Sequence, residues 1–305
     1  MPTRTIRTTM SGLAVVMACT VLPGRSPSAQ PADLAFLGPR GTYSEQAALA
    51  VQAARSAPSA PTPEETLGAV VDAVAGGRAR LGILPIAATV SSFPAAAHAA
   101  LLRAPDPGWR VVGEVQLPIV SHLLVRPGTR REDLRRVLSH PNALREAGVA
   151  LRRDFGDLQQ VETASTAAAA REVAASDGTI AAVAGPAAAP LFGLVPLAEG
   201  IQDDPHNTTL FWVIGPAASS PAEAPNRLVL IVDAAGGSGA FGDAVTALTG
   251  LGFRVSFVNS APLPGPPFAF RYALAATAPT SVSLARVRAA LATVPHTLVG
   301  AYAVP

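Results

Sequence analysis

The chain has 305 residues, of which 49% are hydrophobic and only 14% charged, and its formal net charge is +2. This balance is typical of a well-packed protein of two or three domains and excludes a disordered chain. No basic run is interleaved with aromatic residues, so the sequence gives no support for a nucleic-acid partner.

Residues 1–32 differ from the rest and have the pattern of an export signal. Arg4 and Arg7 precede the short apolar stretch SGLAVVMACTVLP, and small residues follow it. A basic start and an apolar segment too short for a comfortable membrane span predict a secretory signal peptide, and hence an exported or periplasmic protein. The alternative is a mis-assigned start codon in front of a cytoplasmic protein.

From residue 33 to residue 215, short apolar runs alternate with helical patterns, which predicts α/β layers with mostly parallel strands. The expected strands are 32–38, 80–86, two extended segments within 109–128, 134–140, 161–165, 179–185 and 211–216. The expected helices are 42–56, 64–77, 141–156, 166–176 and a small-residue helix after residue 185.

A proline- and serine-rich linker, residues 216–226, precedes a segment with its own rhythm, residues 227–305. Here the strands RLVLIVDA, RVSFVNSAP, FAFRYALAATA and TLVGAYAV surround the helices GAFGDAVTALTGLG and SVSLARVRAALATVP. The order β-α-β-β-α-β predicts a ferredoxin-like domain.

Polar side chains gather where helices are expected to begin. A helix N-terminus offers unpaired N–H groups and the positive end of the helix dipole, which suit a carboxylate or a phosphate. One such site is usually an ordinary helix cap, but several at the carboxyl ends of strands would form an anion pocket. The residues at these starts are Thr42, Ser44, Ser139, His140, Ser165 and Thr166.

The sequence contains neither a GxSxG nor a GxxxxGK[ST] motif, the patterns that carry nucleophilic and nucleotide chemistry. Cys19 is the only cysteine, the five histidines are scattered, and no metal site is predicted. The pair Glu64–Glu65 is expected to open a helix. The pair Asp203–Asp204, in a turn-like segment, can be structural or functional.

Four segments, in this order and spacing, resemble the prephenate dehydratase family: FLGPRGTYSEQAA, SHPNAL, TASTAAAA and AAVAGPAAAPLFGLVPLAEGIQDDPHNTT. The resemblance covers residues 34–305, and residues 227–305 are similar to the family's ACT-type regulatory domain. It implies a catalytic domain over residues 33–215 with two lobes, like a periplasmic binding protein. The lobes would exchange strands near 115–121 and again near 201–211.

The resemblance also implies a carbon–oxygen lyase that converts prephenate to phenylpyruvate, with loss of water and carbon dioxide, for phenylalanine biosynthesis. No cofactor is needed. Thr209 would donate a hydrogen bond or a proton to the leaving hydroxyl, and Asn207 and Thr208 would shape its loop. The residues that would orient the substrate are Thr42, Ser44, Ser139, His140, Ser165 and Thr166.

Two catalytic motifs depart from the family. Where the family usually has Thr-Arg-Phe, this chain has Thr209-Leu210-Phe211, and Pro-Ile-Glu-Asn-Ser is replaced by PIAAT, residues 85–89. The lost arginine is a natural bidentate partner for a carboxylate. Arg40 and Arg126 are the candidates to replace it.

The regulatory segments depart as well. In the family, phenylalanine binds between subunits, which implies a homo-oligomer with Gly239, Ala240 and Ser260 at an L-phenylalanine site. Here the family's Glu-Ser-Arg-Pro is NSAP, residues 259–262, so a dimerising domain without an effector is the alternative. Two further functions stay open: an exported binding protein for small carboxylates, and a dehydratase for arogenate.

Overall fold

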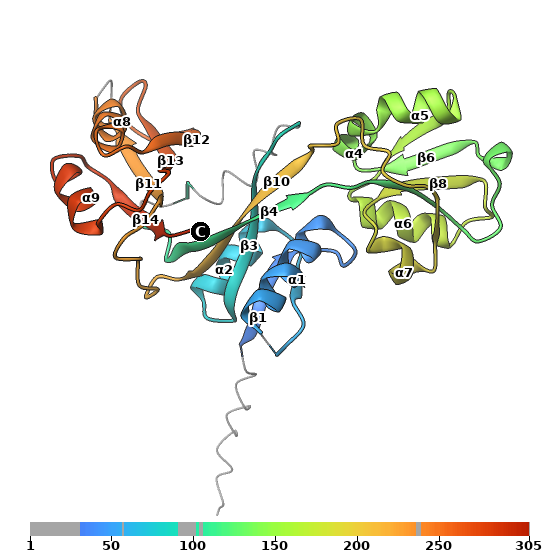
Figure 1. Cartoon of the computed structure of the whole chain (residues 1–305), viewed down its shortest axis with the longest axis horizontal. Helices are drawn as coiled ribbons and strands as arrows, with labels where there is room; N and C mark the ends of the chain where they lie inside the picture. Colours follow the sequence, from blue (N-terminus) through green and yellow to red (C-terminus); the bar gives the residue numbers. More distant parts are fainter. Residues whose placement is uncertain (1–30, 57, 91–101, 104–105, 236–238, 305) are drawn as a thin grey trace, which may run out of the picture. The chain divides into compact units, whose positions relative to one another are not determined.

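The computed structural model describes residues 31–56, 58–90, 102–103, 106–235 and 239–304, so nearly all of the predicted leader lies outside the described residues. The described strands form two sheets, and helices pack against both of them (Figure 1). The α/β class and the two-lobed, periplasmic-binding-protein-like architecture are confirmed.

The first lobe is a small α/β unit in which β1 pairs in parallel with both of its neighbours. Its elements are β1 (Ala32–Leu37), α1 (Tyr43–Arg55), β2 (Thr62–Glu64), α2 (Leu67–Ala75) and β3 (Ala79–Ala88). The helices lie beside β1 and β3 in Figure 1. They do so because each turns a buried stripe of small or branched apolar residues toward the sheet: Ala47 and Val51 from α1, Val70 and Val74 from α2.

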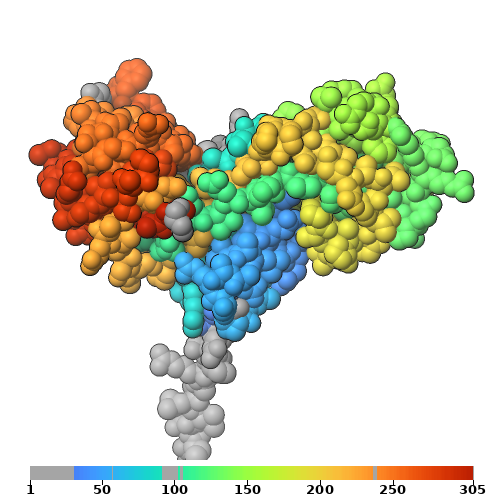
Figure 2. All heavy atoms as spheres, viewed as in Figure 1, coloured from blue at the N-terminus to red at the C-terminus, as the bar shows by residue number. Residues whose placement is uncertain are grey.

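Two long strands connect the lobes. The chain leaves the first sheet along β4 (Trp109–Pro118) and returns along β10 (Thr208–Pro216). The two strands pair antiparallel over their whole length, and Figure 2 shows their green and gold atoms side by side. β10 also pairs antiparallel with β3. Both connecting strands, β4 and β10, are therefore part of the sheet of the first lobe.

The second lobe contains the five-stranded sheet, with the order β7-β6-β8-β5-β9. Its strands are β5 (His122–Val125), β6 (Arg136–Ser139), β7 (Gln159–Glu162), β8 (Ile180–Ala184) and β9 (Val195–Ala198). Its helices are the 3-10 turn η1 (Arg131–Asp133), α4 (Pro141–Glu146), α5 (Gly148–Phe155), α6 (Thr166–Ala174) and α7 (Ala188–Phe192).

The strand directions differ from the expected mostly parallel arrangement, because both sheets are mixed. β6 is parallel to β7 and β8, whereas β5 is antiparallel to β8 and β9. The antiparallel pairs arise where β4, β5 and β10 carry the chain between the lobes without the crossover helix that parallel neighbours need.

Two predicted helices have different limits in the structure. The single helix expected over 141–156 is two helices, because the Asp203 carboxylate accepts hydrogen bonds from the N–H groups of Val149 and Ala150 (2.9 and 2.8 Å) and so starts α5 anew. The helix expected to open at Glu64–Glu65 begins at Leu67, and Glu64 belongs instead to strand β2.

The C-terminal segment has the predicted element order. Its elements are β11 (Arg227–Ala234), α8 (Ala240–Gly250), β12 (Arg254–Pro262), β13 (Phe270–Thr277), α9 (Leu284–Ala290) and β14 (Thr297–Tyr302). The sheet order β12-β13-β11-β14 is ferredoxin-like, and β14 also pairs with β4, which gives the nine-stranded order β12-β13-β11-β14-β4-β10-β3-β1-β2. Glycine at position 300 permits this approach, because a Cβ there would lie 2.9 Å from Val111 Cβ.

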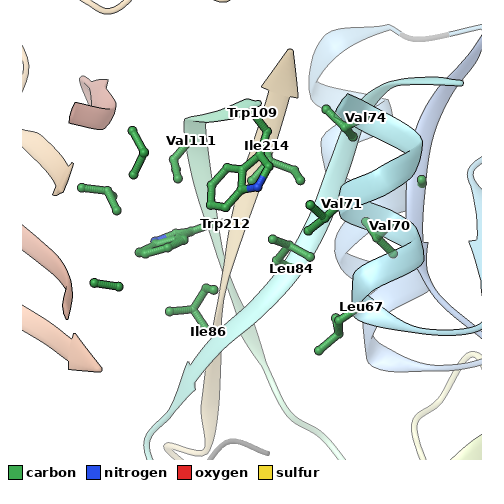
Figure 3. Packing of buried hydrophobic residues seen from close by; sticks show 14 of the residues in the cluster. Leu67, Val70, Val71, Val74, Leu84, Ile86, Trp109, Val111, Trp212 and Ile214 are labelled. Atoms are coloured by element: carbon green, nitrogen blue, oxygen red, sulfur yellow. The ribbon is translucent and has the colours of Figure 1, made fainter. Parts of the chain in front are cut away.

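One hydrophobic core joins the first lobe to the C-terminal sheet. Figure 3 shows α2 turning its apolar side chains toward β3 and toward the indole rings of Trp109 and Trp212. Trp212 meets Phe257 of β12 edge to face, with ring centroids 5.8 Å apart. The strand that carries Thr209 is therefore anchored by packing at its middle.

Candidate active site

A cavity of about 430 Å³ is lined by residues of both lobes. Its walls come from the β1–α1 turn, the end of β3, the start of β10 and the starts of α4 and α6. Six of the predicted site residues line it: Thr42, Ser44, His140, Ser165, Thr166 and Thr209. The structure thus brings together helix starts that are more than 120 residues apart in the sequence.

The start of α1 is built by local capping. Thr42 is the N-cap, and its Oγ1 accepts the Glu45 N–H at 3.4 Å. The Glu45 carboxylate in turn accepts the Gly41 N–H at 2.6 Å. Gly41 has φ of 87°, a left-handed conformation that favours glycine. The glycine turn at the end of β1 therefore directs the first turn of α1 toward the cavity.

The starts of α6 and α4 supply the second-lobe side of the cavity. Ser165 caps α6 by accepting the Ala168 N–H at 3.0 Å. His140 caps α4 in the same way, since its Nδ1 accepts the Asn142 N–H at 3.2 Å. Burial lowers the pKa of His140, so the ring is neutral at pH 7 and carries its hydrogen on Nε2. His140 is therefore a neutral hydrogen-bond donor.

Three hydroxyl groups of the described cavity lining, those of Ser44, Thr166 and Thr209, are free to act on a ligand. Thr209 is held on β10 between Ala88 of β3 and Leu117 of β4, and it is 8% exposed. Within the described part of the chain, none of these three hydroxyl groups makes a hydrogen bond. Thr209 thus has a rigid backbone and a hydroxyl available to a substrate.

Three predicted site residues do not line the cavity but hold its walls. Ser139 is fully buried and donates to the Val183 carbonyl at 2.6 Å, which ties β6 to β8. Asn207 is buried, and its Nδ2 donates to Glu146 Oε2 at 2.8 Å. Thr208 donates to the His206 carbonyl at 3.1 Å.

Two carboxylates that the sequence analysis did not select also line the cavity, Glu65 and Glu146. Glu146 ends α4, where no motif marks it, and only the approach of Asn207 from the returning segment brings it into the site. The expectation of a helix-opening role for Glu64–Glu65 is wrong: Glu64 pairs with Arg78 at 3.0 Å, and Glu65 faces the cavity.

The other acidic pair, Asp203–Asp204, is structural. Asp203 starts α5, as described above, and Asp204 Oδ1 accepts the His206 N–H at 2.8 Å. Both carboxylates therefore shape the segment that returns to β10.

Tyr43 closes the cavity where the chain crosses between the lobes. Its hydroxyl donates to the Val120 carbonyl at 3.0 Å and lies 3.0 Å from Ser121 Oγ. Burial raises the pKa of Tyr43 to about 12, with Glu146 adding to the shift. The phenol thus stays neutral and links α1 to the crossing segment.

The two altered motif positions face each other outside the cavity lining. Leu210 of β10 pairs with Ala87 of β3, whereas Thr209, Phe211 and Ala88 line the cavity. Ala87 packs instead against the core that contains Trp212. In the family these positions hold Arg and Glu, so this chain has lost both members of a facing pair, which leaves no uncompensated charge.

Neither Arg40 nor Arg126 replaces the missing arginine in the cavity. Arg40 pairs with Glu45 at 3.0 Å and is half exposed, and Arg126 donates to the Ser176 carbonyl in another part of the second lobe. Among the described lining residues there is no arginine or lysine. The partial charges of the helix starts are therefore the electropositive groups of this site.

No cluster of His, Cys, Asp and Glu in the described ranges has the arrangement of a metal site. No described helix is long and apolar enough to span a membrane.

The three residues predicted to bind L-phenylalanine lie on two elements of the C-terminal segment. Gly239 and Ala240 begin α8, and Ser260 lies on β12 opposite Tyr272. The Tyr272 ring is 4.6 Å from the ring of Phe241 on α8.

The fold is that of a two-lobed α/β protein with a cavity lined by residues of both lobes. A family model described as prephenate dehydratase matches residues 34–219, and the chain belongs to that family. A bifunctional chorismate mutase/prephenate dehydratase of Stutzerimonas stutzeri is 31% identical over 233 residues, which are 76% of this chain. The match spans 62% of that relative's length.

Two solved structures are similar over most of the chain. Prephenate dehydratase from Arthrobacter aurescens in complex with L-Phe has a TM-score of 0.78 and 25% identity, and the match covers 89% of this chain and 90% of that one. GqqA, described as a novel type of quorum quenching acylase, has a TM-score of 0.75 and 29% identity, with 89% and 98% covered.

Proposed function

We propose that this protein is a dehydratase that converts prephenate to phenylpyruvate. The observation that carries the proposal is the meeting of the α1, α4 and α6 starts with the free hydroxyl of Thr209 in one cavity. Three helix starts suit a substrate with two carboxylates, and a fixed donor suits a leaving hydroxyl.

The reaction breaks two bonds that join substituents to the ring. The ring carboxylate leaves as carbon dioxide, its bonding electrons complete the aromatic ring, and the ring hydroxyl leaves with the electrons of its C–O bond. Thr209 donates a hydrogen bond to that oxygen, which takes a proton from solvent and leaves as water. The helix starts and His140 Nε2–H hold the carboxylates, so the protein contributes orientation and electrostatic stabilisation.

The test is turnover of prephenate by the purified chain, with phenylpyruvate followed by its absorbance in alkali. We expect turnover that saturates with prephenate. Binding of prephenate without turnover would contradict the enzyme and support the alternative, an exported binding protein for small carboxylates. If the chain neither binds nor converts prephenate, prephenate-like carboxylates are excluded as its ligands.

A second candidate is dehydration of arogenate, which differs from prephenate by an amine on its side chain. The specific observation in its favour is the presence of Glu65 and Glu146 in a cavity without arginine or lysine among its described residues. A carboxylate attracts an ammonium group and repels a carboxylate. Comparing kcat/KM for the two substrates decides between them.

The similarity to a quorum-quenching acylase adds one assay. The purified chain is incubated with acylated quorum-sensing signals, and release of the free acid is measured. We expect no release at an enzyme concentration that turns over prephenate completely. Release of the acid without turnover of prephenate would contradict the dehydratase and support an acylase.

We also propose that the C-terminal segment forms an ACT-type domain of a homo-oligomer that binds L-phenylalanine near Gly239, Ala240 and Ser260. The contact of Phe241 on α8 with Tyr272, opposite Ser260, supports a common location for these segments. Calorimetric titration with L-phenylalanine tests the binding, and the mass of the protein in solution tests the homo-oligomer.

Export has its own test, in which residues 1–32 are fused to a reporter that works only outside the cytoplasm.

A further inference from the structure

A second cavity, of about 610 Å³, lies where the start of β4, residues 217–222 and β14 meet; we call it the seam cavity. The hydrogen bond from the Ala222 N–H to the Ala301 carbonyl (2.8 Å) ties the linking segment to β14. The pairing of Gly300 with Val111 joins β14 to β4. The walls of the seam cavity are thus held by backbone contacts.

The lining of the seam cavity is basic. It includes Arg110, Arg288 and His296, and none of its described lining residues is acidic. Arg110 is already paired with Asp106 at 2.9 Å. Arg288, an exposed residue in the last turn of α9, makes no ion pair or hydrogen bond within the described residues. An arginine without a partner that lines the same cavity as a second basic group favours an anion there.

The neutral groups of the seam cavity suit an oxyanion on a small apolar body. Ser219 and Ser220 add hydroxyl groups, while Val112 and Leu298 add apolar surface. The His296 ring is oriented by its Nδ1, which lies 2.8 Å from the Val294 carbonyl and donates to it. Hydroxyl groups and a fixed ring next to an arginine can hold the oxygens of a carboxylate or a phosphate.

The remaining polar group of the wall does not compete for this role. Tyr302 turns its hydroxyl to Glu114 Oε2 at 2.9 Å, and Glu114 Oε1 lies 3.1 Å from Arg227 Nε. The Glu114 carboxylate is therefore neutralised by its own arginine. This leaves Arg288 and His296 as the basic groups without an acidic partner.

We propose that the seam cavity binds a small oxyanion, a carboxylate or phosphate group, which Arg288 holds together with His296 and the two serine hydroxyls. This site is separate from the cavity between the lobes, since the two linings share no residue. The proposal does not depend on the dehydratase reaction.

The test is titration of the full chain with inorganic phosphate and, separately, with benzoate, observed through the imidazole nitrogens in NMR at pH 7. His296 reports on the seam cavity and His140 on the cavity between the lobes; a His296→Gln variant assigns the first signal. We expect saturable movement of the His296 signal. Saturation with benzoate alone assigns a carboxylate on an apolar body, and saturation with phosphate alone assigns a phosphate.

The decisive variant is Arg288→Gln, which we expect to weaken oxyanion binding by at least about tenfold, the loss of one charge-assisted contact. The matched control is Arg286→Gln, an exposed arginine of the same helix that does not line the seam cavity, with unchanged binding. If Arg288 served only the C-terminal end of α9, its variant would lose stability but bind as the wild type. That result, or movement of His140 alone, would overturn the proposal.

Discussion

The cavity between the lobes and the seam cavity have opposite charges. The first contains Glu65 and Glu146, a neutral histidine and no arginine or lysine among its described residues. The second contains Arg110, Arg288 and His296 without a described carboxylate. The two proposed sites would hold an anion by different physical means: the cavity between the lobes through the partial charges of helix starts, and the seam cavity through the full charges of side chains.

This difference has consequences for selectivity. Helix starts give fixed N–H donors at positions that the backbone determines, so they can orient a ring acid with little loss of side-chain entropy. Arginine gives a stronger attraction, but one that salt screens when the group is exposed. The cavity between the lobes therefore suits orientation for a reaction, and the seam cavity suits reversible binding.

The largest expected effect tests whether the first cavity is catalytic. Thr209→Ala removes the free hydroxyl on β10, and we expect kcat/KM for prephenate to fall by about 10²–10³, as for the loss of one positioned donor. Thr209→Ser keeps the hydroxyl and is the matched control, expected within about tenfold of the wild type. Phenylpyruvate formation by Thr209→Ala within twofold of the wild type would exclude this role.

The second prediction tests whether the Tyr43 phenol, in the wall of the cavity between the lobes, is shielded from water. The pKa of Tyr43 is raised from its ordinary value near 10 to about 12, so the unfolded chain loses its proton first. Between pH 10 and 12 the free energy of unfolding should thus decrease by about 1.4 kcal/mol per pH unit from this group. Urea unfolding at pH 9, 10 and 11 measures it.

Tyr43→Phe should remove this part of the pH dependence, while at pH 9 it should lose only about 1 kcal/mol with its hydrogen bond. Tyr302→Phe is the comparison for the seam cavity. Burial and the nearby Glu114 raise the pKa of Tyr302 as well, so its variant should also flatten the alkaline decrease. If the free energy of unfolding decreases equally steeply with pH in the wild type and in Tyr43→Phe, the Tyr43 hydroxyl is accessible to water.

A third prediction tests the charge of the first cavity. Glu146→Gln keeps an acceptor for Asn207 but removes the negative charge, so we expect kcat/KM for prephenate relative to arogenate to rise about tenfold, or about 1.4 kcal/mol. Glu172→Gln on the exposed side of α6 is the control. An unchanged ratio would mean that Glu146 does not face the substrate side chain.

The smallest expected effect on turnover concerns the altered motifs. Ala87→Glu and Leu210→Arg should each cost about 1–3 kcal/mol of stability by placing an unpaired charge at a half-buried position. The double variant should regain most of that loss, because the positions face each other across β3 and β10. Its turnover should stay within about threefold, whereas a tenfold gain would place position 210 at the substrate.

Much of the fold followed from local signals in the sequence. The β-α-β-β-α-β order of residues 227–305 and the helix starts at Thr42, Ser165 and His140 were predicted from periodicity and capping residues. The limits of α5 and β2 were not, because α5 begins where a carboxylate 54 residues later caps it and β2 exists by pairing with β1. Such contacts leave no periodic signal.

For the site, the sequence by itself determined which groups are available, since hydroxyls at helix starts and motif order are properties of neighbouring residues. The tertiary structure decided which of them meet. It placed Thr42, Ser165 and Thr209 in one cavity, Ser139 in the core, and Ala87 and Leu210 outside the lining. It also brought Glu146 into the site and Arg288 to the seam cavity, because charge at a site depends on distances across the fold that residue order does not encode.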